Sequence, residues 1–140
     1  MNDNPCTDSR YPLSALTGRI IAAAEEVPRT LGPGFRELVY QRASAKELPA
    51  HRLAHKREVE IDIFYKGKKV ARRRVDFVIE DGSGDVMVEI KAKAALEGVD
   101  VVQALSYLKA SGYGVGLLLN FESERLQIKR LANEPIVAKE

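Results

Sequence analysis

Apolar residues recur at a helical spacing in the first third of the chain. From Ser14 onward they return every three or four positions, which predicts a helix with Ser14 as its N-cap and an interruption at Pro28. A second helix is predicted from Phe35 to about Leu48, where Pro49 ends it. The residues expected to face the core from this second helix are Phe35, Leu38, Val39 and Leu48.

The middle of the chain alternates between apolar and polar positions, as strands do. Residues 58–65 alternate strictly, which predicts a half-exposed strand. Two apolar runs, 75–79 and 86–90, flank a polar link that contains glycines at 80–85, and this arrangement predicts a hairpin. With a turn at 66–69, these three strands are expected to form an antiparallel meander.

A helix and a buried strand are predicted after the meander. The helix is expected near residues 99–111 and ends at Gly112, and residues 115–119 form the continuous apolar run of a central strand. Because a helix intervenes, this strand should lie parallel to the third strand of the meander. Residues 126–131 indicate a weak edge strand. The predicted fold class is therefore α/β, a sandwich with a mixed sheet and N-terminal helices.

The register of the predicted hairpin brings two acids together. With residues 81–84 as its loop, Asp76 lies opposite Glu89 and Arg74 opposite Lys91 on one face. The other face is apolar throughout: Val75, Phe77, Ile79, Val86, Val88 and Ile90. Two carboxylates on a mostly apolar hairpin repel each other unless a positive charge lies between them. A divalent cation with oxygen ligands would supply that charge. The alternative is a solvated sheet edge where Arg74 and Lys91 neutralise the acids.

Length and composition indicate one ordinary globular domain. The chain has 140 residues, of which 45% are hydrophobic and 30% charged. Residues 13–132 are expected to form the domain, with flexible tails at 1–12 and 133–140. No apolar run approaches the roughly 18 residues that span a bilayer. The single cysteine, Cys6, fits a reducing compartment, and the first residues lack a signal-peptide pattern. The expected location is therefore the cytoplasm, with no membrane partner.

Basic residues cluster locally although the formal net charge is only +2. Six of the nine residues from 66 to 74 are Lys or Arg, so an argument for nucleic-acid binding must rest on this cluster. Arg72 and Arg74 are the better candidates for phosphate contacts, because alternation places both on the face of Asp76. Lys68 is considered with them, although a solvated turn is the alternative for residues 66–69.

Asp76 followed by Glu89-Ile90-Lys91 on the adjoining strand resembles the signature of PD-(D/E)xK nucleases. The segment Gly34-Phe35-Arg36-Glu37-Leu38-Val39-Tyr40 looks like the defining motif of the GxxExxY family, a small bacterial group within that superfamily. Further segments fall in that family's order: 31–34, 74–76, 88–92, 103–108 and 116–121. The resemblance covers roughly residues 16–131.

The resemblance implies a restriction-endonuclease-like fold and a divalent metal, Mg²⁺ or Mn²⁺. It implies that Asp76 and Glu89 hold the metal, with the carbonyl of Ile90 as a third ligand. Glu37 resembles the helix-borne acid that completes such sites, directly or through water. Lys91 would steady the attacking hydroxide or the charge that develops on the phosphate. An ordinary exposed helix acid is the alternative for Glu37.

Gln103 and Tyr107 resemble the Gln-x-x-x-Tyr element that orients metal or DNA backbone in related exonuclease-type domains. The alternative is that they straddle a helix boundary. Members of the family often carry His-Glu ahead of this glutamine, whereas here Asp100 and Val101 stand there. Tyr40 is expected to pack against the sheet and not to touch substrate.

The sequence therefore predicts a metal-dependent nuclease that hydrolyses phosphodiester bonds of nucleic acid, with DNA as the expected partner. One alternative is a module on the same fold that binds nucleic acid or protein without cutting; the retention of Asp76, Glu89 and Lys91 argues against it. Another is a scaffold in which the two carboxylates only pair with Arg74 and Lys91. Superfamily members often dimerise, so a homodimer is a further expectation.

Overall fold

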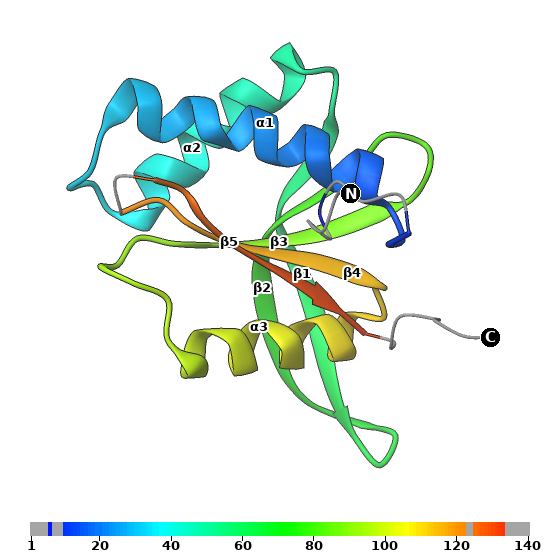
Figure 1. The fold of residues 1–140 in the computed structure, drawn as a ribbon. Helices are drawn as coiled ribbons and strands as arrows, with labels where there is room; N and C mark the ends of the chain where they lie inside the picture. The colour runs from blue at the N-terminus through cyan, green and yellow to red at the C-terminus, as the bar shows by residue number, and fades with distance from the viewer. Residues whose placement is uncertain (1–5, 7–9, 123–124, 134–140) are drawn as a thin grey trace.

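The structure, a computed structural model, describes Cys6 and residues 10–122 and 125–133 (Figure 1). Within this part of the chain no helix is long and apolar enough to cross a membrane. The helices and strands are α1 Ser14–Leu31, α2 Glu37–Ala50, β1 Ala54–Tyr65, β2 Lys68–Glu80, β3 Asp85–Lys91, α3 Gly98–Ser111, β4 Val115–Asn120 and β5 Gln127–Ala132.

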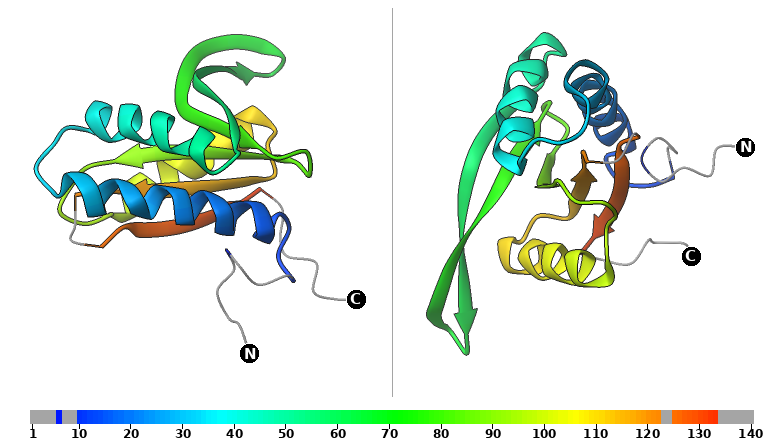
Figure 2. Two further views of the ribbon diagram at one scale, coloured as in Figure 1. Left: turned by 90° about the horizontal axis from the view of Figure 1, so that it is seen from above. Right: turned by 90° about the vertical axis from the view of Figure 1, so that its left-hand side faces the viewer.

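One mixed sheet, with the strand order β1-β2-β3-β4-β5, runs through the molecule. Neighbouring strands are antiparallel except for β3 and β4, which are parallel because α3 connects them. Figures 1 and 2 show α1 and α2 on one face of the sheet and α3 on the other. The predicted α/β fold, with its three-strand meander, crossover helix and parallel strand, is confirmed.

Each face of the sheet has its own apolar core. Ile20 of α1 packs with Phe77 and Val88 on one face, and Leu108 of α3 packs with Met87 on the other. Successive residues of a strand point to opposite faces, so β3 contributes to both cores. Val88 and Met87 are 1% and 0% exposed, as expected for a strand that is covered on both sides.

The boundaries of α1 differ from the prediction at both ends. The helix continues through Pro28 to Leu31, because a proline in the last turn removes only one backbone donor. The Pro28 carbonyl still accepts a hydrogen bond from Gly32 N–H at 2.8 Å. Ser14 is the first helical residue and not the cap; Leu13, with a φ of 58°, occupies the N-cap position and makes no side-chain capping bond.

The core face predicted for α2 is wrong for three of its four residues. Phe35, which precedes the helix, and Leu38 are each 43% exposed, and Val39 is 38% exposed; only Leu48 is buried. The helix also begins at Glu37 and continues through Pro49. The side chains that it buries are Tyr40, Gln41, Ser44 and Leu48.

Contacts of Tyr40 explain the orientation of α2. The Tyr40 hydroxyl donates to the carbonyl of Gly32 at 2.7 Å, and the ring stacks on Phe121 with 5.3 Å between centroids. Tyr40 is fully buried, so the prediction that it packs against the sheet is confirmed. These specific contacts, together with those of Gln41 described below, outweigh the burial of three aliphatic or aromatic side chains.

The alternation of β2 side chains between the two faces of the sheet is interrupted at Asp76. The β1–β2 ladder omits the pair of Asp76 with Glu58, whose φ of 52° lies in the left-handed region. The β2–β3 ladder begins only at Phe77 and Val88. As a consequence Phe77 faces α1 and α2 whereas Val75 lies in the core under α3. The apolar face predicted for the hairpin is therefore right except for Val75.

The N-terminal segment contributes at least one residue to the core. Cys6 is 4% exposed, and the Thr17 hydroxyl donates to its carbonyl at 2.6 Å. At the other end, the Asn133 amide donates to the carbonyls of Leu108 and Tyr113, at 3.2 and 3.0 Å. The predicted tails otherwise fall largely on residues 1–5, 7–9 and 134–140, which lie outside the described residues, so the domain limits stay predictions.

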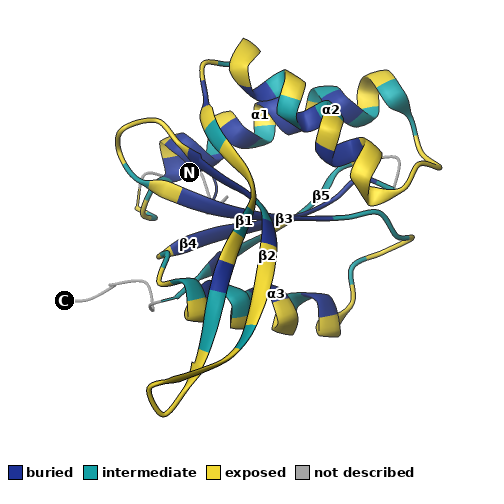
Figure 3. Ribbon diagram, turned by 180° about the vertical axis from the view of Figure 1, so that it is seen from behind, coloured by how far each residue is buried: buried dark blue, intermediate teal, exposed yellow. Residues whose placement is uncertain are grey.

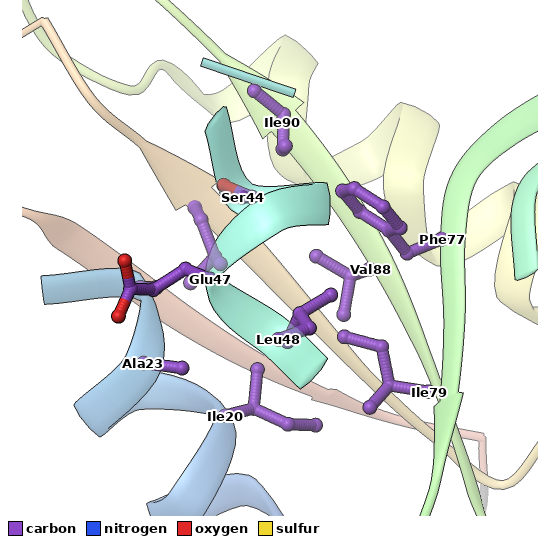
Figure 4. Close-up of a pocket in the computed structure, with 11 residues that line it drawn as sticks. Ile20, Ala23, Ser44, Glu47, Leu48, Phe77, Ile79, Val88 and Ile90 are labelled. Carbon is purple, nitrogen blue, oxygen red and sulfur yellow. The ribbon is translucent and has the colours of Figure 1, made fainter. Parts of the chain in front are cut away.

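A small cavity lies between α1, α2 and the sheet (Figure 4). Its volume is about 10 Å³, and Ile20, Leu48, Phe77 and Ile79 are among the side chains that line it. The Ser44 hydroxyl reaches its wall and has no hydrogen-bond partner among the described residues. The space holds about one water at most, so the cavity is a packing defect and not a ligand site.

The contacts of Tyr40 give the first testable expectation. Tyr40→Phe should lower the free energy of unfolding by about 1 kcal/mol, because the Gly32 carbonyl loses its donor. Tyr40→Ala should lower it by about 3–5 kcal/mol, because a cavity opens beside Phe121. Urea unfolding followed by circular dichroism measures both. The matched control is Tyr65→Phe at an exposed tyrosine, which should change stability by less than about 0.5 kcal/mol. Equal stabilities of Tyr40→Phe and wild type would contradict this account.

Candidate active site

Asp76 and Glu89 meet where the β2–β3 ladder ends. The backbone N–H of Asp76 donates to Oε1 of Glu89 at 3.0 Å, and the backbone N–H of Ile90 donates to Oδ2 of Asp76 at 2.7 Å. Each carboxyl group therefore accepts a bond from the neighbouring strand, as a backbone carbonyl would in a regular ladder. The two acids meet as the register predicted, but their side chains are inserted into the ladder.

Burial raises the pKa of Glu89 from its ordinary 4.5 to about 8. The residue is only 7% exposed, and loss of water is the largest cause of the rise. The charge of Asp76 raises the pKa further, whereas the backbone N–H of Asp76 and the ammonium group of Lys91 oppose the rise. Glu89 therefore carries a proton at neutral pH when no cation neutralises the pair.

Gln41 of α2 orients Asp76. Its Nε2 donates to Oδ1 of Asp76 at 2.7 Å, and the residue is 5% exposed. Its Oε1 is buried and has no hydrogen-bond partner among the described residues. An orphaned amide oxygen is unfavourable unless a donor or a cation completes it. Gln41 was not among the predicted site residues; its position one helical turn after Glu37 was the available signal.

Lys91 extends the site toward α3. Its Nζ donates to Oε1 of Gln103 at 3.4 Å, and its charge acts on Glu89. The crossover helix thus brings Gln103 to the end of β3 at which the acids lie. Figure 1 shows that α2 and α3 both begin at this end of the sheet, on opposite faces.

One further predicted site residue stays a prediction, and one predicted contact is wrong. Tyr107, one turn beyond Gln103, is partly buried against the core under α3, and its role in the site stays a prediction. The expected pairing of Lys91 with Arg74 is wrong, because the β2–β3 ladder does not extend past Phe77.

Glu37 is an exposed residue at the first position of α2. Across residues 10–122 and 125–133, together with Cys6, no three His, Cys, Asp or Glu side chains are grouped closely enough to hold one ion. Glu37 therefore does not join Asp76 and Glu89 in this conformation. Its role as a further ligand, directly or through water, stays a prediction.

The arginines of β2 face the acids of β1. The contacts are Arg72 with Asp62 and Glu60, at 3.1 and 3.3 Å, and Arg74 with Glu58 and Glu60, at 3.8 and 3.9 Å. All these side chains are substantially exposed, so each pair adds little stability, but the acids balance the arginine charge. The predicted phosphate contacts of Arg72 and Arg74 must therefore compete with these acids. Lys68 lies at the first position of β2, far from the carboxyl pair.

A buried amide fixes the segment that follows Lys91. Asn120 is fully buried; its Oδ1 accepts from Lys93 N–H at 3.0 Å, and its Nδ2 donates to the Lys93 carbonyl at 2.8 Å. The Lys93 ammonium donates to Asp100 at 2.9 Å, and Asp100 caps α3 by accepting from Glu97 N–H at 2.8 Å. Asp100 thus serves as a helix cap. Asn120 was not predicted, although a polar residue that directly follows a buried apolar run was a signal.

The oxygen atoms gathered at this point suit a hard divalent cation. They belong to the carboxyl groups of Asp76 and Glu89 and to the side-chain amide of Gln41, whose Oε1 has no partner among the described residues. Ile90 lies next to them, because its N–H donates to Asp76. Mg²⁺ and Mn²⁺ prefer oxygen ligands. The raised pKa of Glu89 means that the pair is stabilised by added positive charge. The residues present therefore fit the implied metal.

The raised pKa of Glu89 gives a pH dependence that can be measured without metal. Between about pH 4.5 and 8 the folded state keeps a proton that the unfolded chain has released, so the unfolding free energy should fall as the pH rises through this window. Urea unfolding in EDTA measures the fall. Glu89→Gln should flatten it, whereas the control Asp85→Asn, at an exposed acid of the same strand, should not. Identical pH profiles for Glu89→Gln and wild type would contradict the geometry.

Comparisons with known proteins agree with this fold. Residues 14–131 match the family model of the PD-(D/E)XK nuclease superfamily. A solved structure described as the crystal structure of SSO0001 is similar with a TM-score of 0.53 at 15% identity, over 91% of this chain and 63% of that one. That identity supports the fold alone, and this chain spans less than two thirds of that structure's length. No curated protein gives a significant match. Because the family model spans most of the chain, the protein belongs to the PD-(D/E)XK nuclease superfamily.

Proposed function

We propose that this protein is a metal-dependent nuclease that hydrolyses phosphodiester bonds in DNA. The observation that carries the proposal is the buried pair of Asp76 and Glu89, in which the pKa of Glu89 rises to about 8. Burying two neighbouring carboxyl groups costs free energy, and such perturbed groups are concentrated at functional sites. The nuclease superfamily makes nucleic acid the substrate class.

Asp76, Glu89 and the carbonyl of Ile90 are the proposed ligands of Mg²⁺ or Mn²⁺. The metal, when bound, would lower the pKa of water and neutralise charge on the phosphate. Gln41 holds Asp76 in position through the hydrogen bond from its Nε2. Because its Oε1 has no partner among the described residues, Gln41 also offers an acceptor to a water in the site.

Hydrolysis forms a bond from the oxygen of water to phosphorus and breaks the bond to the bridging oxygen. The water gives up a proton, and the bridging oxygen takes up a proton to leave as a hydroxyl end. Negative charge builds on the phosphate oxygens as this happens. The Lys91 ammonium group lies at the carboxyl pair and would stabilise that charge. Gln103 supports Lys91 by accepting its hydrogen bond at 3.4 Å. Tyr107, on the same helix, is proposed to contact the backbone of the nucleic acid.

Finer assignments belong to the same proposal. Residues 34–40 support membership in the GxxExxY group. Glu37 would add a ligand to the metal when substrate is bound, directly or through water. Arg72, Arg74 and Lys68 would contact phosphates, the first two in competition with the acids of β1. A cytoplasmic location and a homodimer are the corresponding expectations for the protein in the cell.

A cleavage assay tests the proposed activity. Labelled single- and double-stranded DNA should be cut in the presence of Mg²⁺ or Mn²⁺ and not in EDTA. Asp76→Asn, Glu89→Gln and Lys91→Met should each reduce the rate by about 10²-fold or more, because the first two remove proposed metal ligands and the third removes the cation that acts on the developing charge. The control is Lys109→Met, at an exposed lysine in the last turn of α3, which should cut at the wild-type rate.

The result that would refute the activity is stable binding of DNA by the wild-type protein without cleavage under either metal. That outcome would favour a binding module on the nuclease fold. A Lys91→Met variant as fast as wild type would instead refute the role of this lysine and leave the metal site standing.

Gln41 offers a separate test of the metal site. Gln41→Ala should weaken Mn²⁺ binding by about tenfold, since removal of a residue that orients a ligand typically costs 10- to 100-fold. Gln41→Glu should strengthen it, because a third carboxylate joins the pair. Isothermal titration calorimetry measures both variants, and equal Mn²⁺ affinities for Gln41→Ala, Gln41→Glu and wild type would contradict the assignment.

A further inference from the structure

β1 and β2 continue beyond the sheet as a two-stranded ribbon. β2 pairs with β3 only between Phe77 and Glu80, whereas its pairing with β1 extends to Lys68. The ribbon ends in the turn formed by Lys66 and Gly67, both with positive φ. Figures 1 and 2 show that this end projects past α3 and away from the body of the protein.

Large apolar side chains gather at the end of this ribbon and are exposed. Phe64, Tyr65 and Val70 are 60%, 63% and 61% exposed, and Figure 3 shows the whole end of the hairpin as exposed surface. Aromatic side chains that are this exposed at a projecting end are accessible to a partner. We call residues 64–70 the ribbon tip.

Each aromatic ring of the ribbon tip stands beside a lysine. Phe64 is opposite Lys69 and Tyr65 is opposite Lys68 in the β1–β2 ladder, and opposed residues share a face. Because Phe64 and Tyr65 are consecutive, they point to opposite faces. Both faces of the ribbon tip therefore carry one ring and one ammonium group. Lys66 adds a third, with its Nζ 5.5 Å from the centroid of the Tyr65 ring.

Ion pairs balance part of the positive charge of the ribbon. Arg72 and Arg74 pair with acids of β1, Lys69 pairs with Asp62 at 3.3 Å, and the Arg73 guanidinium donates to the carbonyl of Arg72 at 2.9 Å. In the part of the chain that the structure describes, no acid lies within ion-pair distance of Lys66 or Lys68. The tip segment itself contains no acid. A partner of the tip must therefore bring negative charge.

We propose that the ribbon tip binds single-stranded nucleic acid. Phe64 and Tyr65 stack on unpaired bases, and Lys66 and Lys68 contact the neighbouring phosphates. Exposed ring faces with adjacent cations are the combination that single-strand-binding proteins use. In a duplex each base is already stacked on its neighbours and offers no free face to a ring. The inference takes its substrate class from the proposed function and narrows it to nucleic acid with an unpaired segment.

Electrostatics disfavours a second copy of the chain as the occupant of the tip. In a two-fold contact whose axis passes through the tip, the tip of one copy meets the tip of the other. The lysines of one tip would then face those of the other with no acid between them, and like charges placed opposite each other are destabilising. A basic surface of another protein would be repelled by the tip lysines in the same way.

The tip and the carboxyl pair can engage one substrate molecule. Lys68 and Asp76 both lie on β2, and at about 3.3 Å per residue the strand between them spans roughly 26 Å. Unpaired nucleotides extend further than the 3.4 Å spacing of a duplex strand, so about eight nucleotides are the most that this length requires.

Fluorescence anisotropy in EDTA tests the tip without any need for cleavage. The double variant Phe64→Leu/Tyr65→Leu keeps apolar bulk and removes both rings. The oligonucleotide should be long enough to reach from Asp76 to Lys68. The variant should bind it, as a single strand, at least about fivefold more weakly than wild type does, and its affinity for duplex should be unchanged. In Lys66→Gln/Lys68→Gln, the negative slope of log K against log salt concentration should become shallower by about 0.7 per lysine.

Matched controls separate the tip from general effects. Val70→Ala, at the exposed aliphatic residue of the same tip, and Lys109→Gln, at a lysine of α3, should bind single strands as wild type does. All variants should keep the wild-type melting temperature, because the altered side chains are exposed.

Two results would overturn the inference. One is wild-type affinity for single strands in Phe64→Leu/Tyr65→Leu. The other is a wild-type dimer in sedimentation that Phe64→Ser/Tyr65→Ser makes monomeric, which would assign the tip to self-association. Tip-dependent binding in a protein that never cleaves would support this inference and refute the proposed nuclease activity, so the two failures are distinguishable.

Discussion

Two carboxyl groups, Asp76 and Glu89, replace backbone acceptors at the point where β2 separates from β3. Much of the structure adjusts to this exchange. Glu58 takes a left-handed conformation opposite Asp76, and the faces of β2 invert there, so that the strand leaves the sheet as a free ribbon. α2 turns Gln41 inward to bind Asp76, and three apolar side chains at its start remain exposed. Around the site, the strand pairing is therefore irregular and several apolar side chains are exposed, while the two acids lie together.

Helices on both faces of the sheet reach the carboxyl pair. α2 approaches from one face of the sheet with Gln41, and α3 approaches from the other with Gln103, which binds Lys91. The buried Asn120 fixes the connection between β3 and α3 through both backbone atoms of Lys93. In the proposed nuclease, hydrogen bonds of this kind would hold the reacting groups in position before substrate arrives.

The sequence predicted the elements, the strand order of the meander, the parallel fourth strand and the meeting of Asp76 with Glu89. These depend on alternation and turn chemistry, which are local. It did not predict the burial of Gln41 or the exposure of Leu38, because the orientation of α2 depends on tertiary contacts of Tyr40 and Asp76 that periodicity does not encode. It placed Val75 on the wrong face because strict alternation assumes an unbroken strand. Ion pairs between Arg72 and the acids of β1 likewise required the cross-strand register.

Proton release on metal binding tests the central claim most directly. If Asp76 and Glu89 form one site in which Glu89 has a pKa of about 8, Mn²⁺ binding near pH 7 must displace close to one proton. Calorimetric titration of Mn²⁺ in buffers with different ionisation enthalpies measures that number. One bound Mn²⁺ and about one released proton per chain are expected. In Glu89→Gln this proton release should disappear. Absence of Mn²⁺ uptake, or uptake without proton release, would contradict the central claim.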